Sequence, residues 1–114
     1  MTDRELLEAA AKAAGMSGCA VDYDDRLAFL EDGKPASVEW NPLTDDGDAL
    51  RLAVKLQLNE LWFDRSTGRP EVVCGKPGFG AIAVEPIRED PYAATRRAIV
   101  RAAASLPDTD GGKR

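Results

Sequence analysis

The chain has 114 residues, which suits a single domain, and 44% of them are hydrophobic while 31% are charged. This balance is typical of a globular protein and excludes collagen-like and disordered chains. Histidine is absent from the sequence. Within one chain, its absence excludes Ser-His-Asp and Cys-His catalysis, histidine-ligated zinc and histidine proton relays.

The net charge of −5 conceals an uneven distribution along the chain. Residues 1–50 carry 12 acidic and 4 basic side chains, whereas residues 51–114 carry 8 acidic and 11 basic ones. Duplex DNA or an anionic membrane requires a concentrated basic surface on its partner. The overall balance therefore argues against nucleic acid or a membrane as the main partner.

Two features of the sequence predict a cytoplasmic protein. It has no run of about 18 apolar residues, so no transmembrane helix is expected. It begins with charged residues and lacks the basic, apolar and small-residue regions of a signal peptide. Disulfides are unusual in a reducing compartment, so Cys19 and Cys74 are expected to be buried free thiols.

The first predicted element is a helix that begins after Thr2. Thr2 and Glu5 have the three-residue spacing of a capping box. Gly15 suits the left-handed conformation that ends a helix. The apolar stripe of this helix consists of Leu6, Leu7, Ala10, Ala11 and Ala14.

Residues 19–40 are predicted to be extended. One short strand is expected over 19–23, and strands over 27–30 and 37–40 flank an Asp32-Gly33 pair that permits a tight hairpin turn. Pro35 cannot donate a hydrogen bond to a ladder, so its strand should begin after it or lie at a sheet edge.

A second helix is predicted after the turn at Asn41-Pro42. Thr44 or Asp45 is the expected N-cap, and Asp46 and Asp48 place negative charge in the first turn, where the helix dipole favours it. The helix is apolar over a wide arc, so we expect it to be well buried. Its apolar positions are Leu50, Leu52, Ala53, Val54, Leu56 and Leu58.

Three further strands are predicted over 61–64, 71–74 and 79–84, with a hairpin-like loop at 65–70. The segment from Ala81 to Val84 does not alternate with polar residues. A strand that is apolar on both sides needs cover on both faces. This segment therefore predicts a three-layer arrangement.

The third predicted helix begins at Asp90, its expected N-cap, with Pro91 at the first helical position. Pro107 is expected to end it. Residues 107–114 are polar and glycine-rich, which predicts a disordered tail after a single domain that spans residues 1–106.

Two acidic clusters have the oxygen ligands that Mg²⁺ and Ca²⁺ prefer. Asp45, Asp46 and Asp48 do not fit the EF-hand spacing, and helix capping accounts for them. Asp22 and Asp24 would share one strand face, but no partner motif accompanies them. We therefore predict no metal site, and a small metal-binding protein or metal-dependent enzyme that uses these carboxylates is the alternative.

Residues 75–80, Gly-Lys-Pro-Gly-Phe-Gly, share only their glycines and lysine with a phosphate loop. A Walker A motif ends in Gly-Lys-Ser/Thr and precedes a helix, whereas an apolar strand follows here. We interpret the segment as a turn between strands that can present Lys76 and Phe79 to a partner.

Arginine and tryptophan residues are the remaining candidates. Arg97 and Arg101 are four residues apart and project together from the third helix beside Arg96. We interpret the three as a solvated face, with pairing to the acidic N-terminal half as the next choice and nucleic-acid binding as the third function. Trp40 and Trp62 are interpreted as core residues, and exposure of either would mark a recognition surface.

The stretch Trp-Asn-Pro-Leu-Thr-Asp-Asp-Gly-Asp-Ala-Leu-Arg-Leu-Ala at 40–53 resembles the phage ABA-sandwich domain family of small phage and prophage proteins. The segments 3–14 and 90–103 support the resemblance, which covers residues 3–105. It implies helices on both faces of a sheet and no established activity, so it carries no catalytic residues over to this chain.

These observations predict an α+β fold in which three helices pack on both faces of a mostly antiparallel sheet, an α-β-α sandwich. No complete catalytic constellation is visible, so we expect no catalytic residue and no cofactor. The expected function is that of a non-enzymatic phage or prophage accessory protein that binds another protein or a second copy of itself. The expected partner surface comprises Trp40, Lys76, Phe79, Arg97 and Arg101.

Overall fold

The computed structural model describes residues 2–15, 21–23, 26–28, 30–31, 34–35, 40–66 and 68–106. Three helices lie in these ranges: α1 (Asp3–Ala13), α2 (Asp46–Leu56) and α3 (Pro91–Ala104). The strands are β1 (Val21–Tyr23), β2 (Arg26–Ala28), β3 (Leu30–Glu31), β4 (Lys34–Pro35), β5 (Glu60–Asp64), β6 (Glu71–Lys76) and β7 (Gly80–Pro86). The predicted α+β class, with three helices and an antiparallel sheet, is confirmed.

The strands form three separate sheets. Strands β5, β6 and β7 make an antiparallel sheet in that order, while β1 pairs with β2 and β3 pairs with β4 as two short hairpins. Strands β3 and β4 lie on either side of Asp32-Gly33, a pair that is itself outside the described residues. Pro35 lies in an edge strand, as one of its two predicted alternatives requires, because β4 belongs to a sheet of two strands. The extended segments before and after α2 therefore do not share one sheet among the described residues.

The helix ends follow the local sequence signals. Thr2 and Glu5 form the predicted reciprocal capping box of α1, and Gly15 follows that helix with a φ of 78°. Asp45, of the two candidates, caps α2 by accepting a hydrogen bond from the Asp48 amide at 2.8 Å. Asp90 caps α3, with Pro91 at its first position.

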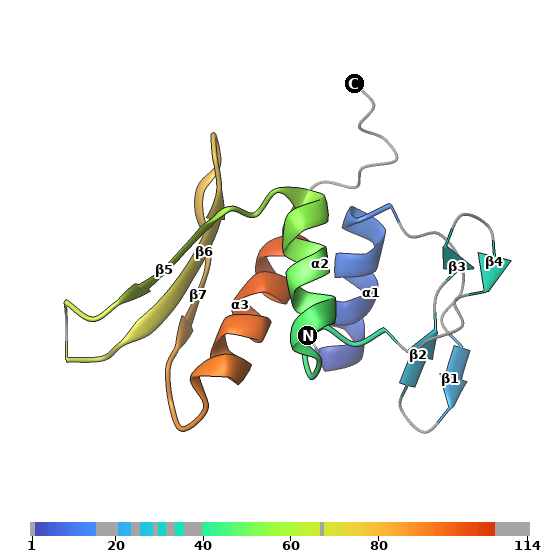
Figure 1. Ribbon diagram of the computed structural model, residues 1–114, viewed down its shortest axis with the longest axis horizontal. Helices are drawn as coiled ribbons and strands as arrows, with labels where there is room; N and C mark the ends of the chain where they lie inside the picture. The colour runs from blue at the N-terminus through green and yellow to red at the C-terminus, as the bar shows by residue number, and fades with distance from the viewer. Residues whose placement is uncertain are drawn as a thin grey trace.

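The main core lies between the helices and one face of the β5–β6–β7 sheet. Helix α3 packs on β6 and β7, and α1 and α2 both pack on α3 (Figure 1). The two short hairpins lie on the far side of the helices from this sheet (Figure 1). The fully buried members of this core are Ala10, Val72, Cys74, Ala98, Val100, Ala102 and Ala103.

Small residues in α1 and α3 allow these two helices to approach closely. Ala98 and Ala102 on α3 and Ala10 on α1 have no exposed surface. Close packing of this kind excludes water from a wide area with little side-chain entropy lost. The close contact between α1 and α3 thus explains why both helices are rich in alanine.

The prediction that Ala81 to Val84 are covered on both faces is wrong for the described residues. Ala83 is buried under the helices, but Ala81 and Val84 are exposed. Strand β7 lies at the edge of its sheet and is irregular opposite Cys74 and Gly75, so it needs no second helical layer. In the described ranges, helices cover one face of the sheet (Figure 1).

Helix α2 is also less buried than its wide apolar arc predicted. Ala49, Leu52 and Leu56 face the core, whereas Leu50 and Val54 are exposed. Helix α2 packs on α3. The side of α2 that carries Leu50 and Val54 is open to solvent among the described residues.

Some predictions concern residues outside the described ranges. They are the Cys19 thiol, the Asp24 carboxylate, the strand at 37–40 except for Trp40, and the tail at 107–114. Trp40 itself belongs to no strand. None of the helices in the described residues has the length and apolar character needed to cross a membrane.

Candidate protein-binding surface

Strand β5 exposes three successive apolar side chains. The exposed fractions of Leu61, Trp62 and Phe63 are 41%, 44% and 52%. Neighbouring side chains on a strand point to opposite faces, so β5 offers apolar groups on both sides of the sheet. A strand that is apolar on both sides normally lies in the middle of a sheet that is covered on both faces. The middle residues of β5 are instead exposed, whereas those of β6 are buried.

The register assigns each side chain of β5 to a face. Leu61 is opposite Cys74, and Phe63 is opposite Val72. Directly paired residues share a face, and Val72 and Cys74 belong to the core between sheet and helices. Leu61 and Phe63 therefore lie on the helix side of the sheet, beyond the area that α3 covers.

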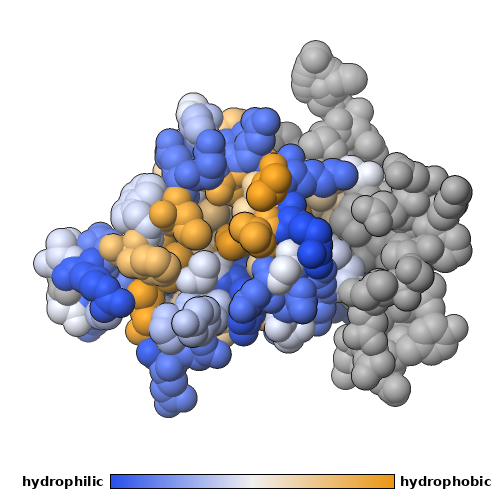
Figure 2. All heavy atoms as spheres, in the orientation of Figure 1, coloured by the Kyte–Doolittle hydropathy of each residue, from blue (hydrophilic) through white to orange (hydrophobic). Residues whose placement is uncertain are grey.

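Exposed apolar residues of α2 adjoin this part of the sheet. Leu50 and Val54, four residues apart on α2, are 64% and 69% exposed. Apolar side chains gather over α2 and β5 on one face of the molecule (Figure 2). We call Leu50, Val54, Leu61 and Phe63 the α2–β5 apolar surface.

The other face of the sheet carries a second, smaller apolar row. Trp62 is opposite Val73, which is opposite Val84 on β7. Val73 is buried between its neighbours, while Trp62 and Val84 are 44% and 40% exposed. The interpretation of Trp62 as a core residue is therefore wrong, and its exposure meets the sequence criterion for a recognition surface.

The turn between β6 and β7 presents the two residues expected there. The Phe79 amide donates to the Lys76 carbonyl oxygen at 2.8 Å, and Pro77 and Gly78, with a φ of 87°, occupy the central positions of a type II turn. Phe79 is exposed, and the Lys76 ammonium lies 5.7 Å from the centre of its ring. This cation–π contact orients the two side chains together.

Arg97 and Arg101 line a cavity of about 370 Å³ with Leu6, Ala104 and Ser105. Asp3 neutralises Arg97 at 3.0 Å, and Glu85, which is mostly buried, pairs with Arg101. Arg101 also donates to the Val84 carbonyl oxygen at 3.1 Å. The predicted pairing of these arginines with the acidic N-terminal half is found within the chain for Arg97, and the cavity carries no excess of positive charge.

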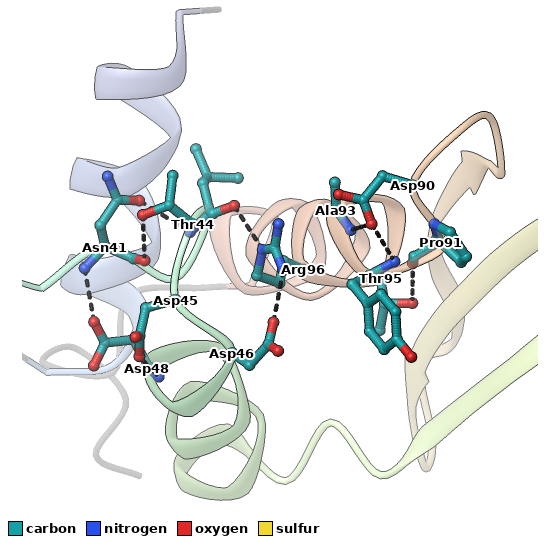
Figure 3. A network of polar contacts seen from close by, with 12 residues as sticks. Asn41, Thr44, Asp45, Asp46, Asp48, Asp90, Pro91, Ala93, Thr95 and Arg96 are labelled. Atoms are coloured by element: carbon teal, nitrogen blue, oxygen red, sulfur yellow. Dashed lines mark hydrogen bonds and ion pairs between the residues drawn. The ribbon is translucent and has the colours of Figure 1, made fainter.

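A polar network holds the corner before α2 (Figure 3). The buried Asp48 carboxylate accepts from the backbone N–H of Asn41 at 2.9 Å and from Arg51 at 2.7 Å. This contact with Asp48 raises the pKa of the Arg51 guanidinium. Asp46 accepts from Arg96 at 2.6 Å. Each of the three aspartates at 45–48 thus has a protein partner.

No group of three or more side chains suited to a metal ion occurs among the described residues. Asp45 caps α2, while Asp46 and Asp48 form ion pairs with Arg96 and Arg51. Asp22 lies in β1, opposite Leu27 in the register of the hairpin.

Trp40 and Cys74 have structural positions. Trp40 is partly buried and packs against both apolar clusters of the core. Cys74 is fully buried, as predicted, and burial raises the pKa of its thiol to about 11. The buried, protonated thiol is a poor nucleophile at neutral pH.

The five residues expected to form one partner surface lie on three different parts of the fold. Lys76 and Phe79 are together on the β6–β7 turn, Arg97 and Arg101 are together on α3, and Trp40 precedes α2. Sequence reasoning missed the α2–β5 apolar surface. Its signal was present, because residues 61–63 are apolar on both sides of a strand that has no proline or glycine.

Comparisons with protein-family models, with curated proteins and with solved structures find no match to this chain.

Proposed function

We propose that the chain is a phage or prophage accessory protein that acts by binding another protein rather than by catalysis. The phage part of this proposal rests on the resemblance carried by residues 40–53. The binding part rests on one observation, which is the exposure of the α2–β5 apolar surface.

Exposed apolar area of this kind has a cost for an unpartnered protein. Monomeric proteins rarely leave contiguous apolar patches open unless the patches have a function. Aromatic residues such as Phe63 and Trp62 contribute most strongly to binding when a partner removes them from water. A partner that covers Leu50, Val54, Leu61 and Phe63 would gain this contribution.

Site-specific photo-crosslinking in the producing cell tests the binding function. The photoreactive residue p-benzoylphenylalanine replaces Phe63 in one chain and Tyr92, which is 69% exposed on α3, in a control chain. We expect a discrete protein adduct at position 63 that is absent at position 92. The adduct should disappear when Leu61→Asp is added, with the fold checked by circular dichroism.

The absence of an adduct at position 63, or equal adducts at both positions, would overturn the proposal. An adduct with the mass of two copies would identify the chain as its own partner, in agreement with binding through this surface. The phage part is tested separately by the gene's neighbours: placement among phage genes supports it, and placement in a conserved housekeeping operon contradicts it.

A further inference from the structure

The two outer strands of the three-stranded sheet differ in how their open edges are protected. Strand β7 contains Pro86, has an extra residue at Ile82 opposite Cys74 and Gly75, and has its Val84 carbonyl bound by Arg101. Proline, bulges and covering cations prevent a further strand from pairing with an edge. Strand β5 has none of these features among its five residues.

Strand β5 therefore retains a regular edge on which another strand can pair. Its five residues are all in register with β6, from Glu60 opposite Gly75 to Asp64 opposite Glu71. No strand in the described parts of the chain pairs with its outer edge. The backbone groups on that edge are available to an extended segment, which is the recognition mode called β-augmentation.

The side chains of β5 specify what such a segment must carry. Glu60, Trp62 and Asp64 alternate onto one face, and Leu61 and Phe63 lie on the other. The carboxylates at the two ends form no ion pair with another described residue. The hydrogen bonds that Ser66 donates to Asp64 lower the pKa of that carboxyl, so it is charged at neutral pH.

A second copy of this chain is a poor occupant. Antiparallel pairing of two β5 strands in full register would set Glu60 of each copy opposite Asp64 of the other. Like charges directly opposite each other destabilise a strand pair. The two carboxylates thus act against self-pairing and in favour of a strand with basic ends.

We propose that β5 binds an antiparallel strand of a partner protein with the pattern basic–apolar–any–apolar–basic. Lysine or arginine would lie opposite Glu60 and Asp64. The two apolar side chains would lie opposite Leu61 and Phe63, which belong to the α2–β5 apolar surface, and apolar side chains gather over α2 and β5 in Figure 2. The inference rests on the proposed function and adds the chemistry of the partner.

Titration of the full chain with capped peptides, followed by backbone amide shifts, tests this pattern. The probe has the core Lys-Val-Thr-Val-Lys, one control has Glu-Val-Thr-Val-Glu, and a second control has the probe's composition in the order Val-Lys-Thr-Lys-Val. We expect shifts in β5 and α2 with the probe and affinity about tenfold weaker for the acidic control, from two exchanged cross-strand charge pairs.

Reversing the charge at position 60 then tests whether the peptide pairs with β5 in the antiparallel orientation. In an antiparallel pair, the residue opposite Glu60 is at the carboxyl end of the peptide. Glu60→Lys should therefore prefer Lys-Val-Thr-Val-Glu over the probe and over Glu-Val-Thr-Val-Lys. Glu89→Lys, which makes the same charge change at an exposed site before α3, should keep the preference of the unaltered chain. Unchanged amide shifts of α3 report that each variant is folded.

If a peptide binds, any of three results would overturn the inference: equal binding of basic and acidic peptides, shifts that map to other elements, or no change of preference in Glu60→Lys. If no peptide binds but photo-crosslinking at position 63 captures a protein, the strand pattern is wrong while the binding function stands. If neither occurs, both fail.

Discussion

At the scale of single residues, Arg96 joins three parts of the fold. Its Nε donates to the Leu43 carbonyl oxygen at 2.8 Å, and Nη1 donates to Asp46 at 2.6 Å (Figure 3). The side chain is mostly buried. It therefore fixes α3 against the corner that leads into α2, with two charge-assisted bonds in a geometry that suits a planar guanidinium.

Arg96→Lys should destabilise the fold, because one ammonium group cannot reproduce both bonds. We expect the free energy of unfolding, measured by urea denaturation, to fall by about 1–3 kcal/mol. Arg88→Lys at an exposed position should change it by less than about 0.5 kcal/mol. Equal stability of the two variants would contradict the role given to Arg96.

The capping residues could be predicted from the sequence, whereas the role of Arg96 could not. Thr2, Asp45 and Asp90 act on amide groups two or three residues away, so the sequence contains the whole interaction. Arg96 contacts residues about fifty positions earlier. Only the packing of α3 beside the corner brings these groups together.

At the scale of elements, α2 shows how a helix with a wide apolar arc divides between core and surface. Leu52 is buried against the core, while Leu50, two residues earlier, is open to solvent. The sequence pattern does not separate them, because both belong to apolar stripes at helical spacing. The division depends on α3, which packs on one side of α2.

Leu52→Ala and Leu50→Ala form a matched pair that tests this division. The first leaves a cavity in the core and should cost about 2–5 kcal/mol of unfolding free energy. The second should change stability by less than about 0.5 kcal/mol. Thermal and urea unfolding of both variants provide the measurement, and a larger loss for Leu50→Ala would show that the helix faces are assigned wrongly.

The β6–β7 hairpin depends on a glycine in β6, the central strand of the sheet. A Cβ at Gly75 would overlap the carbonyl oxygen of Gly80 across the ladder, and that oxygen belongs to the backbone and cannot move freely. Gly68, in the β5–β6 loop, has open space around the same position. The sequence suggested a turn over residues 75–80, but this close approach appears only in the paired strands.

Gly75→Ala should therefore destabilise the sheet by more than Gly68→Ala, whose effect should be within about 0.5 kcal/mol of zero. We expect Gly75→Ala to cost at least about 1–3 kcal/mol, as overpacking does in a well-packed core. Amide hydrogen exchange in β6 and β7 checks the location of the effect. Unchanged protection of both strands would contradict it.

At the scale of the whole molecule, the layers explain why the open surface escaped prediction. The strands at 60–86 lie close to their predicted positions, but the apolar segment at 81–84 implied cover on both faces. Whether a strand is central or at an edge depends on pairing between distant segments. The sequence therefore indicated apolar area that must be covered, and the structure shows that part of it is open.

The uneven charge of the chain is partly balanced inside the fold. Arg96 and Arg97 on α3 pair with Asp46 and Asp3 from the acidic N-terminal half. The Arg97–Asp3 pair is exposed on both sides, and such surface pairs typically contribute less than about 1 kcal/mol and are weakened by salt. Charge pairing therefore helps to orient α3, while the shared apolar core supplies most of the stability.

The most direct test of the open sheet is the solvent exposure of Trp62, measured by acrylamide quenching of its fluorescence in a Trp40→Phe chain at a concentration where the chain is monomeric. We predict emission close to that of tryptophan in water and efficient quenching, because Trp62 lies on an uncovered edge strand. Emission typical of a buried indole, with quenching as weak as that of Trp40 in a Trp62→Phe chain, would contradict the account.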